Sequence, residues 1–250
     1  MEKTDLNFTF LKFAVGEDIQ SGIFIAPKDT TTPLPLLVAI HGHSPAGAWS
    51  LLNSALRAEV LRGKYALYLP SQIGSDASTG APDFCGNKTA DAIVASLETL
   101  RAEHGTVIDS RPAHLFGLSR GAMVGTNLIT RYPALFSKAV LIGGVYDMQA
   151  NLDWSELVPG IRENIIKETG GTPEAIAERS YLSRALNVSA EVLLVHGDAD
   201  RNCEYAQSVA YEKALGDAGK VVQLHTVPGG DHYSLTPPLY RKVIQLFFDK

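Results

Sequence analysis

Hydrophobic and polar residues alternate near the start of the chain and then give way to a different pattern. Residues 7–13 and 21–26 alternate and flank a Gly-Glu-Asp turn at 16–18, which predicts an antiparallel hairpin. After the proline-rich loop at 27–35, hydrophobic residues come in short continuous runs, as is typical of strands buried on both faces. These runs are residues 36–40, 66–69, 113–116, 139–142, 192–195 and 221–227.

Segments with helical spacing lie between these runs. Residues 90–100 and 206–215 place hydrophobic side chains on one helical face, and a last helix is expected at about 238–248. Strands that alternate with helices form a mostly parallel sheet with helices on both faces. We therefore expect an α/β protein with an eight-stranded sheet, extended by the N-terminal hairpin. A chain of 250 residues fits a single domain of this class, spanning 1–250.

Residues 148–189 interrupt this rhythm and form a small helical insertion. We expect one helix through residues 161–168 and another from 172 or 173 to about 180. Long segments of this kind are often functional. The insertion is therefore interpreted either as a lid over the site or as a helical cover of one sheet face.

The charge and cysteine content narrow the possible partners and environment. With 22 basic and 27 acidic residues the formal charge is −5, and no basic run offers a phosphate-binding surface, so nucleic acid is not expected as a partner. The polar N-terminus resembles no signal peptide, and no apolar run is long enough to span a membrane. We expect a soluble, cytoplasmic protein. Cys85 and Cys203, far apart in sequence, are expected to be free thiols.

The sequence Gly117-Leu118-Ser119-Arg120-Gly121 matches the G-x-S-x-G pattern of serine hydrolases. It follows a predicted strand and precedes a helical stretch, which is the context in which a serine is held on a sharp turn. The glycines leave room for such a turn. The alternative interpretation is a glycine-rich turn whose serine caps the next helix.

A serine hydroxyl needs a base to take its proton and a third group to orient that base. Candidates follow Ser119 in the order acid, then histidine. Asp198 and Asp200 come directly after the run 192–195, and His232 follows the run 221–227. The alternatives are that Asp200 caps the next helix and that His232 is an exposed loop residue.

Backbone amides are expected to stabilise the oxyanion that forms during acyl transfer. The amide of Arg120, directly after Ser119, is one candidate, and the amide of His43 is the other, with Ser44 as the alternative. His41 and His43 could suggest a metal site, but no carboxylate or cysteine lies near them in sequence, so neither a metal nor a cofactor is expected. The Arg120 side chain could pair with an acidic substrate group or brace the turn.

In combination these motifs resemble the α/β hydrolases, in particular their prolyl-oligopeptidase-like and dienelactone-hydrolase-like branch. The resemblance implies the α/β-hydrolase fold. It also implies that Asp200 is the acid, because His196-Gly197-x-x-Asp200 has the spacing usual in that branch, whereas Asp198 would brace the loop. The resemblance rests on motifs at residues 41–42, 117–121, 133–140, 196–200 and 230–232. It extends from about residue 36 to the C-terminus.

The chain departs from that branch in two places. Residues 201–204 read Arg-Asn-Cys-Glu where relatives commonly have a Val-Pro pair, and nothing in 250 residues could encode the propeller that precedes the catalytic domain in related peptidases. We therefore expect a carboxylesterase that acts on a small-molecule acyl substrate. The alternatives are a peptidase, thioesterase or lactone hydrolase with the same triad, and a small-ligand binding protein with little turnover. The sequence leaves the natural substrate and the oligomeric state open.

Overall fold

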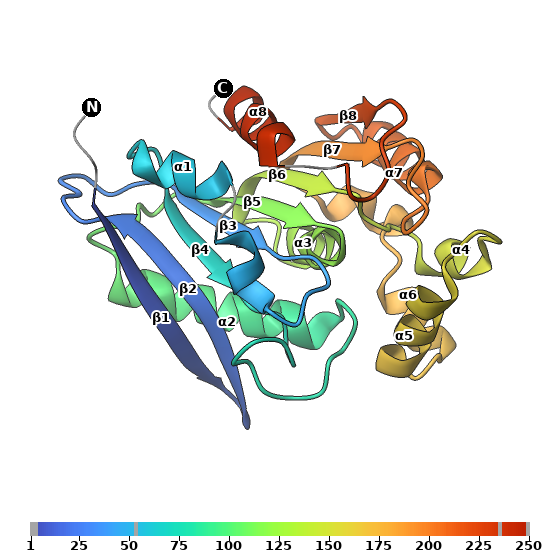
Figure 1. Ribbon diagram of the computed structural model, residues 1–250, viewed down its shortest axis with the longest axis horizontal. Helices are drawn as coiled ribbons and strands as arrows, with labels where there is room; N and C mark the ends of the chain where they lie inside the picture. The colour runs from blue at the N-terminus through green and yellow to red at the C-terminus, as the bar shows by residue number, and fades with distance from the viewer. Residues whose placement is uncertain (1–4, 53–54, 235–236, 249–250) are drawn as a thin grey trace.

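An eight-stranded sheet forms the centre of the protein (Figure 1), in the strand order β1-β2-β4-β3-β5-β6-β7-β8. The structure, a computed structural model, describes residues 5–52, 55–234 and 237–248, so the N-terminal residues 1–4 lie outside it. The strands are β1 (Leu6–Val15), β2 (Asp18–Pro27), β3 (Leu36–Ile40), β4 (Ala66–Pro70), β5 (Ala113–Leu118), β6 (Phe136–Ile142), β7 (Glu191–Gly197) and β8 (Val222–Val227).

The predicted combination of one antiparallel hairpin and a parallel sheet is confirmed. Strand β1 pairs antiparallel with β2, from Leu6 opposite Pro27 to Val15 opposite Asp18, and Gly16 turns the chain with a φ of 61°. Strand β2 also runs antiparallel to β4. From β4 through β8 every neighbouring pair is parallel, which brings the carboxyl ends of these strands to one edge of the sheet.

Alternate residues of the buried strands pack on opposite faces, as the period of a strand requires. In β3, Leu36, Val38 and Ile40 belong to one hydrophobic cluster, whereas Leu37 and Ala39 belong to the other. Helices cover both clusters, and Figure 1 shows α1 and α8 on one side of the sheet and α2 on the other. The cluster of Leu37 and Ala39 is covered by α1 (Ala55–Leu61) and α8 (Pro237–Phe247). The cluster of Leu36, Val38 and Ile40 is covered by α2 (Asn87–Glu103), α3 (Arg120–Arg131) and α7 (Tyr205–Asp217). A 3-10 turn, η1, spans Gly47–Leu51.

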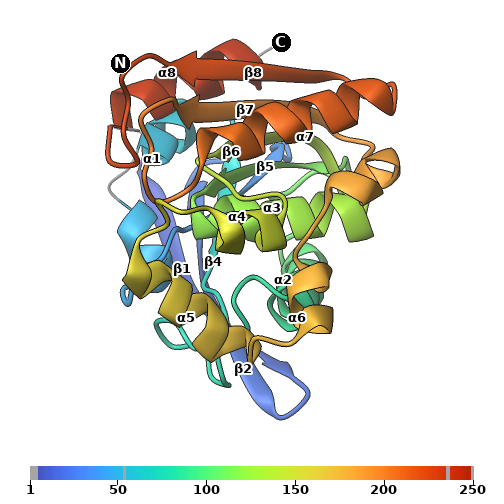
Figure 2. The ribbon, with the colours of Figure 1, turned by 90° about the vertical axis from the view of Figure 1, so that its right-hand side faces the viewer.

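The insertion lies at the edge of the sheet where the parallel strands end (Figures 1 and 2). The two predicted helices are present as α5 (Pro159–Thr169) and α6 (Pro173–Glu178). Two short elements were not predicted, α4 (Met148–Asp153) and the 3-10 turn η2 (Leu182–Asn187). Six residues are too few for a helical hydrophobic period to stand out, and α4 instead begins at a side-chain cap, in which Asp147 accepts from the Ala150 amide.

Within the described part of the chain, no helix is both long enough and apolar enough to cross a membrane.

Candidate active site

Ser119 occupies a strained turn between β5 and α3. Its φ of 54° and ψ of −119° lie outside the regions that a side chain usually allows. The turn is held because Ser119 donates its amide to Ile142 and accepts from the Ala122 amide, at 2.7 and 2.8 Å. A Cβ at Gly121 would lie 2.1 Å from the carbonyl oxygen of Ile40, so only glycine fits there. The strand–turn–helix context predicted for this serine is therefore present.

Ser119, His232 and Asp200 form one hydrogen-bonded chain. The Nδ1 of His232 lies 2.6 Å from Oδ2 of Asp200, and its Nε2 lies 2.9 Å from Oγ of Ser119. An ionised carboxylate can only accept, so Nδ1 carries the proton and donates to Asp200. Nε2 is then left as the acceptor for the serine hydroxyl. The structure thus brings together the three side chains that the sequence singled out.

Asp200 is held as a carboxylate inside the protein. Burial would raise its pKa, but the contacts with His196 and His232 and the amide of Cys203 hold the pKa well below its usual range. Its Oδ1 accepts from the amides of Asn202 and Cys203, at 2.8 and 3.0 Å. A carboxylate that stays charged can orient the imidazole and stabilise its protonated form.

Asp198 faces away from this chain of hydrogen bonds. It is exposed, and its Oδ1 accepts from the amide of Gly229 at 2.6 Å, which braces the loop after β8 as expected. The same two loops meet at Gly197 and Gly230, where a Cβ on Gly197 would lie 2.1 Å from the carbonyl oxygen of Gly230. Of the two candidate acids, the geometry favours Asp200.

The loop after β3 lies against the turn at Ser119. A Cβ on Gly42 would lie 3.5 Å from Cβ of Ser119, and His43 lines the same pocket as the serine. Ser44 is instead used within its own loop, where its Oγ accepts from the Ala46 amide. Arg120 opens helix α3, so its amide has no acceptor inside the helix. His43 therefore lies beside the serine, and its amide remains the predicted second oxyanion donor, with the Ser44 amide as the alternative.

His41 fixes the loop that carries His43. Its Nε2 accepts from the amide of Gln72 at 3.0 Å, so Nδ1 bears the proton and donates to the carbonyl of Gly42 at 2.7 Å. Burial lowers the pKa of His41 to about 4. Both ring nitrogens are therefore engaged with backbone groups, and the ring stays neutral near pH 7.

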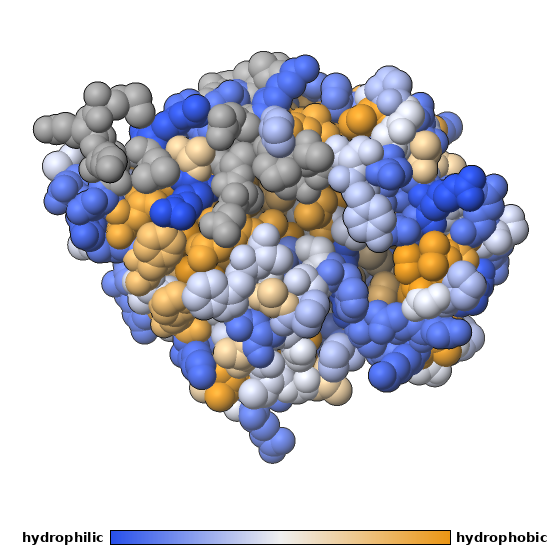
Figure 3. Space-filling model, in the orientation of Figure 1, coloured by the Kyte–Doolittle hydropathy of each residue, from blue (hydrophilic) through white to orange (hydrophobic). Residues whose placement is uncertain are grey.

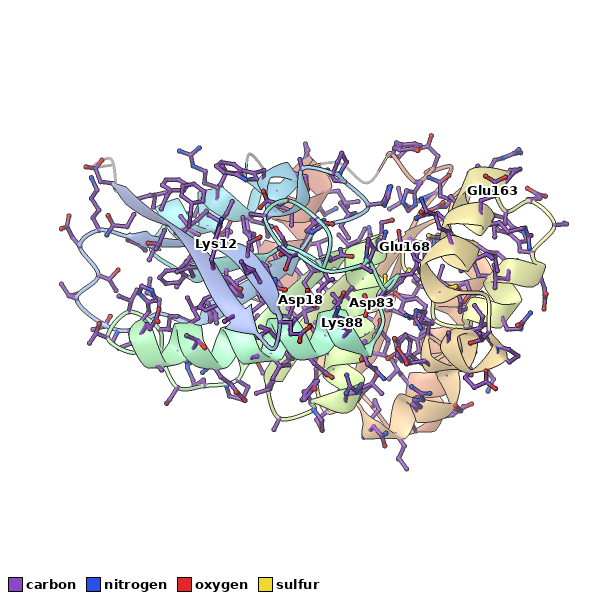
Figure 4. All side chains as sticks on the ribbon, turned by 90° about the horizontal axis from the view of Figure 1, so that it is seen from below. Lys12, Asp18, Asp83, Lys88, Glu163 and Glu168 are labelled. Atoms are coloured by element: carbon purple, nitrogen blue, oxygen red, sulfur yellow. The ribbon has the colours of Figure 1, made fainter. Side chains whose placement is uncertain are left out.

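The Arg120 side chain braces the insertion. Its guanidinium forms a bidentate ion pair with Glu168 of α5 and lies over the ring of Phe84, 4.7 Å from its centroid. Figure 4 shows Glu168 on the side of α5 that faces the sheet, whereas Glu163 lies on the outer side. Of the two roles considered for this side chain, the structure supports bracing. Glu168 itself was not identified from the sequence, because nothing local marks it as a partner.

A pocket of about 650 Å³ opens beside Ser119 and His232. Helix α5 forms part of its wall, and Figure 3 shows hydrophobic surface over the α4–α6 region. Its lining is mostly apolar, with three asparagines among the polar groups. The apolar members include Met123, Val145, Val158, Ile161 and Ile165, and the asparagines are Asn151, Asn164 and Asn202.

The aromatic residues Phe84, Trp154, Tyr146 and Trp49 have different positions relative to this pocket. Phe84 lines it. Trp154 borders a neighbouring hollow, Tyr146 is buried against Tyr211, and Trp49 is exposed. Tyr233, next to His232, lines the pocket and was not singled out from the sequence.

The two cysteines are free and buried, which confirms the prediction that they are thiols. Cys85 donates its thiol to the carbonyl of Arg120, and burial raises its pKa to about 12. Burial raises the pKa of Cys203 as well. Thiols with raised pKa values are poor nucleophiles.

Comparisons with known proteins agree with this geometry. Residues 83–249 match the prolyl oligopeptidase family. The uncharacterized peptidase YtmA of Bacillus subtilis is 27% identical over 185 residues, which cover 72% of this chain and 69% of that protein. The acylamino-acid-releasing enzyme of Rattus norvegicus is 26% identical over 82% of this chain, but the match covers only 29% of the rat enzyme.

Solved structures share the fold at low sequence identity. The acylaminoacyl peptidase of Pyrococcus horikoshii superposes with a TM-score of 0.79 and 20% identity, covering 96% of this chain and 41% of the peptidase. A mutant of the esterase rPPE superposes with a TM-score of 0.73 and 16% identity, covering 94% and 77% of the two chains. The chain belongs to the prolyl oligopeptidase family and is a serine hydrolase with the α/β-hydrolase fold.

Proposed function

We propose that this hydrolase cleaves a carboxylic ester or a related acyl bond of a small molecule, with Ser119 as nucleophile, His232 as base and Asp200 as the orienting acid. The observation that carries the proposal is the unbroken hydrogen-bonded chain from Ser119 Oγ through His232 to Asp200, beside an open pocket. A pocket of about 650 Å³ suits a small organic substrate.

In the first step Ser119 attacks the acyl carbon while His232 Nε2 takes the hydroxyl proton. The amides of Arg120 and His43 stabilise the negative charge on the former carbonyl oxygen. The C–O bond to the leaving group then breaks as His232 returns the proton to that group. Water next loses a proton to His232 and attacks the acyl carbon of the acyl-enzyme. The bond between that carbon and Ser119 Oγ then breaks as His232 returns the proton to Oγ, which releases the acid.

A peptide or other amide is the second candidate substrate, and the relatives named as peptidases support it. The two candidates share every catalytic group and differ in the leaving group, since an amine must be protonated as it departs. The apolar lining beside the serine suits an acyl group of either kind.

The deciding experiment measures kcat/KM for p-nitrophenyl esters of graded acyl length beside aminoacyl p-nitroanilides. We expect turnover of the esters and its loss in Ser119→Ala. Comparable rates on anilides would favour the peptidase, and ester turnover that survives in Ser119→Ala would contradict the mechanism.

A further inference from the structure

The turn that precedes α2 is strained and borders the pocket. Phe84 and Cys85 are neighbours in it, and both have a positive φ, of 41° and 64°. Residues other than glycine rarely adopt this backbone region, and they persist there only where surrounding contacts hold them. Phe84 lines the pocket beside Ser119, so the strain lies at the site itself.

Arg179 of the insertion holds this turn. It lies at the end of α6, is only 5% exposed, and donates its Nε to the carbonyl of Phe84 at 2.7 Å. Its Nη2 donates to the carbonyl of Asp83, and its Nη1 donates to the carbonyl of Ala175 at 2.6 Å. In Figure 4, Asp83 lies at the end of α2 that faces the insertion. The guanidinium thus joins the carbonyls of two adjacent turn residues to α6.

The charge of this buried arginine is only partly compensated. Its ion pair is with Glu178, whose Oε1 lies 3.4 Å away and whose side chain is 33% exposed. Removing a guanidinium from water is unfavourable, and hydrogen bonds to carbonyls offset part of the loss. Arginine alone offers a planar fork of donors that can reach two adjacent carbonyls at once. A Cβ on Gly86 would lie 2.2 Å from Nη2, so the turn leaves space for that fork.

The turn is also held from its other sides. Glu168 of α5 accepts from the amide of Phe84 at 3.1 Å. The thiol of Cys85 donates to the carbonyl of Arg120, at the start of α3, at 3.3 Å. The strained turn therefore lies between the insertion and the helix that follows the serine, and the place of the Phe84 ring depends on both.

The position of Phe84 assigns its ring to the acyl side of the pocket. His232 must give its proton to the leaving group, so that group lies beside the loops after β7 and β8. Phe84 lies instead under the guanidinium of Arg120, 4.7 Å from the ring centroid, and that guanidinium is bound to Glu168 of α5. The wall that Phe84 forms with α5 is then left to the acyl group.

The Phe84 ring is supported from behind. It is only 7% exposed and belongs to the hydrophobic cluster on the α2 and α3 side of the sheet. A ring in a close-packed interior moves only if its neighbours or its backbone move with it. As long as Arg179 holds the turn, a longer acyl chain therefore cannot displace the ring.

We propose that Phe84 limits the length of the acyl group and that Arg179 is the positioning residue that keeps the Phe84 ring in the pocket wall. The protein then prefers esters of short-chain acids over esters of longer acids with the same leaving group. This inference rests on the proposed function, since it assigns one wall of the same pocket.

The test compares p-nitrophenyl octanoate with p-nitrophenyl butyrate, which share a leaving group and differ in acyl length. In Phe84→Ala the ratio of kcat/KM for octanoate to that for butyrate should rise about tenfold, because the missing ring leaves room for further methylenes. Arg179→Met keeps the ring but removes the donors that position it, so it should raise the same ratio. In the double variant Arg179→Met should add nothing to the effect of Phe84→Ala, since there is no ring left to position.

Arg184→Met is the matched control. Arg184 belongs to the same insertion and also donates to backbone carbonyls, but its described hydrogen bonds go to Ala177 and Glu178 of α6 and not to the turn. This variant should leave the ratio unchanged. If a variant does not fold, Phe84→Leu replaces the alanine variant, and Arg179→Lys, which cannot reach both carbonyls, replaces the methionine variant.

The outcomes separate the two proposals. Ser119-dependent hydrolysis of p-nitrophenyl butyrate reports the proposed chemistry by itself. With normal butyrate turnover, an unchanged ratio in the Phe84 variant would overturn the limit set by the ring. A ratio in the Arg179 variant equal to that in Arg184→Met would overturn the positioning role. No Ser119-dependent turnover of any ester would overturn the proposed function and this inference together.

Discussion

Arg120 and Glu168 are 48 positions apart, yet they form a bidentate ion pair whose side chains are only 11% and 10% exposed. Arg120 directly follows Ser119, and Glu168 lies near the end of α5. Glu168 also accepts from the amide of Phe84 at 3.1 Å. The pair therefore joins the serine turn to the helix that walls the pocket, and the position of that wall depends on two charges.

Removing one charge should loosen this connection. In Glu168→Gln the guanidinium of Arg120 stays buried without its counter-ion, so the free energy of unfolding should fall by about 3 kcal/mol. Displacement of α5 should raise KM for an ester more than it lowers kcat. Urea unfolding and steady-state kinetics measure both effects.

Glu163→Gln is the control, because Glu163 is exposed on the same helix (Figure 4) and its loss should change stability by less than about 0.5 kcal/mol. The double variant Arg120→Met with Glu168→Leu should be more stable than Glu168→Gln, since it leaves no unpaired charge. Equal stability of Glu168→Gln and Glu163→Gln would show that the ion pair does not hold the insertion.

The two aspartates after β7 should differ sharply in their effect on turnover. Asp200→Asn removes the carboxylate that orients His232, so kcat should fall by about 10⁴-fold. Asp198→Asn keeps an oxygen that can accept from Gly229 and should lower kcat less than tenfold. Similar losses in the two variants, at similar melting temperature, would contradict the assignment of Asp200.

His41 should make stability depend on pH. Its pKa is about 4 in the folded protein, against an ordinary value near 6.5, so between these values the unfolded chain binds the extra proton. The free energy of unfolding should therefore fall as pH decreases from about 6.5 to about 4, by about 3 kcal/mol from this group.

Chemical denaturation at several pH values measures this slope. His41→Asn should flatten it, whereas His225→Asn, an exposed substitution on β8, should not. The pKa of His114 is also lowered to about 4, mainly by burial, and its contribution is common to all three proteins and cancels. An unchanged slope in His41→Asn would exclude His41 as the source.

Gly121→Ala should disrupt the serine turn. The added methyl group would lie 2.1 Å from the carbonyl oxygen of Ile40, so β3 and α3 must separate or the protein must fail to fold. Gly216→Ala is the contrasting case, because no atom lies within 4 Å of the added carbon in α7 and alanine favours helix by about 1 kcal/mol. Thermal melting should show opposite shifts, and a Gly121→Ala protein with wild-type stability and turnover would contradict the close packing.

Local patterns accounted for most of the fold. The continuous apolar runs predicted the parallel strands, because strands buried on both faces have no polar side, and the turn at residues 16–18 predicted the hairpin. The serine and histidine were identifiable because each follows a strand. The choice of Asp200 over Asp198 needed family resemblance, since both residues follow β7 and the spacing alone does not say which one faces inward.

The remaining parts of the site depend on tertiary contacts. Glu168 looks like any surface residue of an amphipathic helix until α5 packs against Phe84 and Arg120. Asn151 lies in a helix of six residues, which is too short for a hydrophobic period to be recognised in the sequence. That its Oδ1 has no hydrogen-bond partner among the described residues is apparent only from the folded structure. Such features arise between segments that are distant in the chain.

The contact between Gly197 and Gly230 has a consequence for motion during turnover. These glycines join the loops that carry Asp200 and His232 through backbone atoms, and the Ala199 amide donates to the Gly230 carbonyl at 3.0 Å. The loops of the acid and the base are therefore in direct backbone contact with each other. If the insertion shifts when a substrate enters or a product leaves, the imidazole keeps its alignment with the carboxylate, and little reorganisation energy is spent on restoring it in the next cycle.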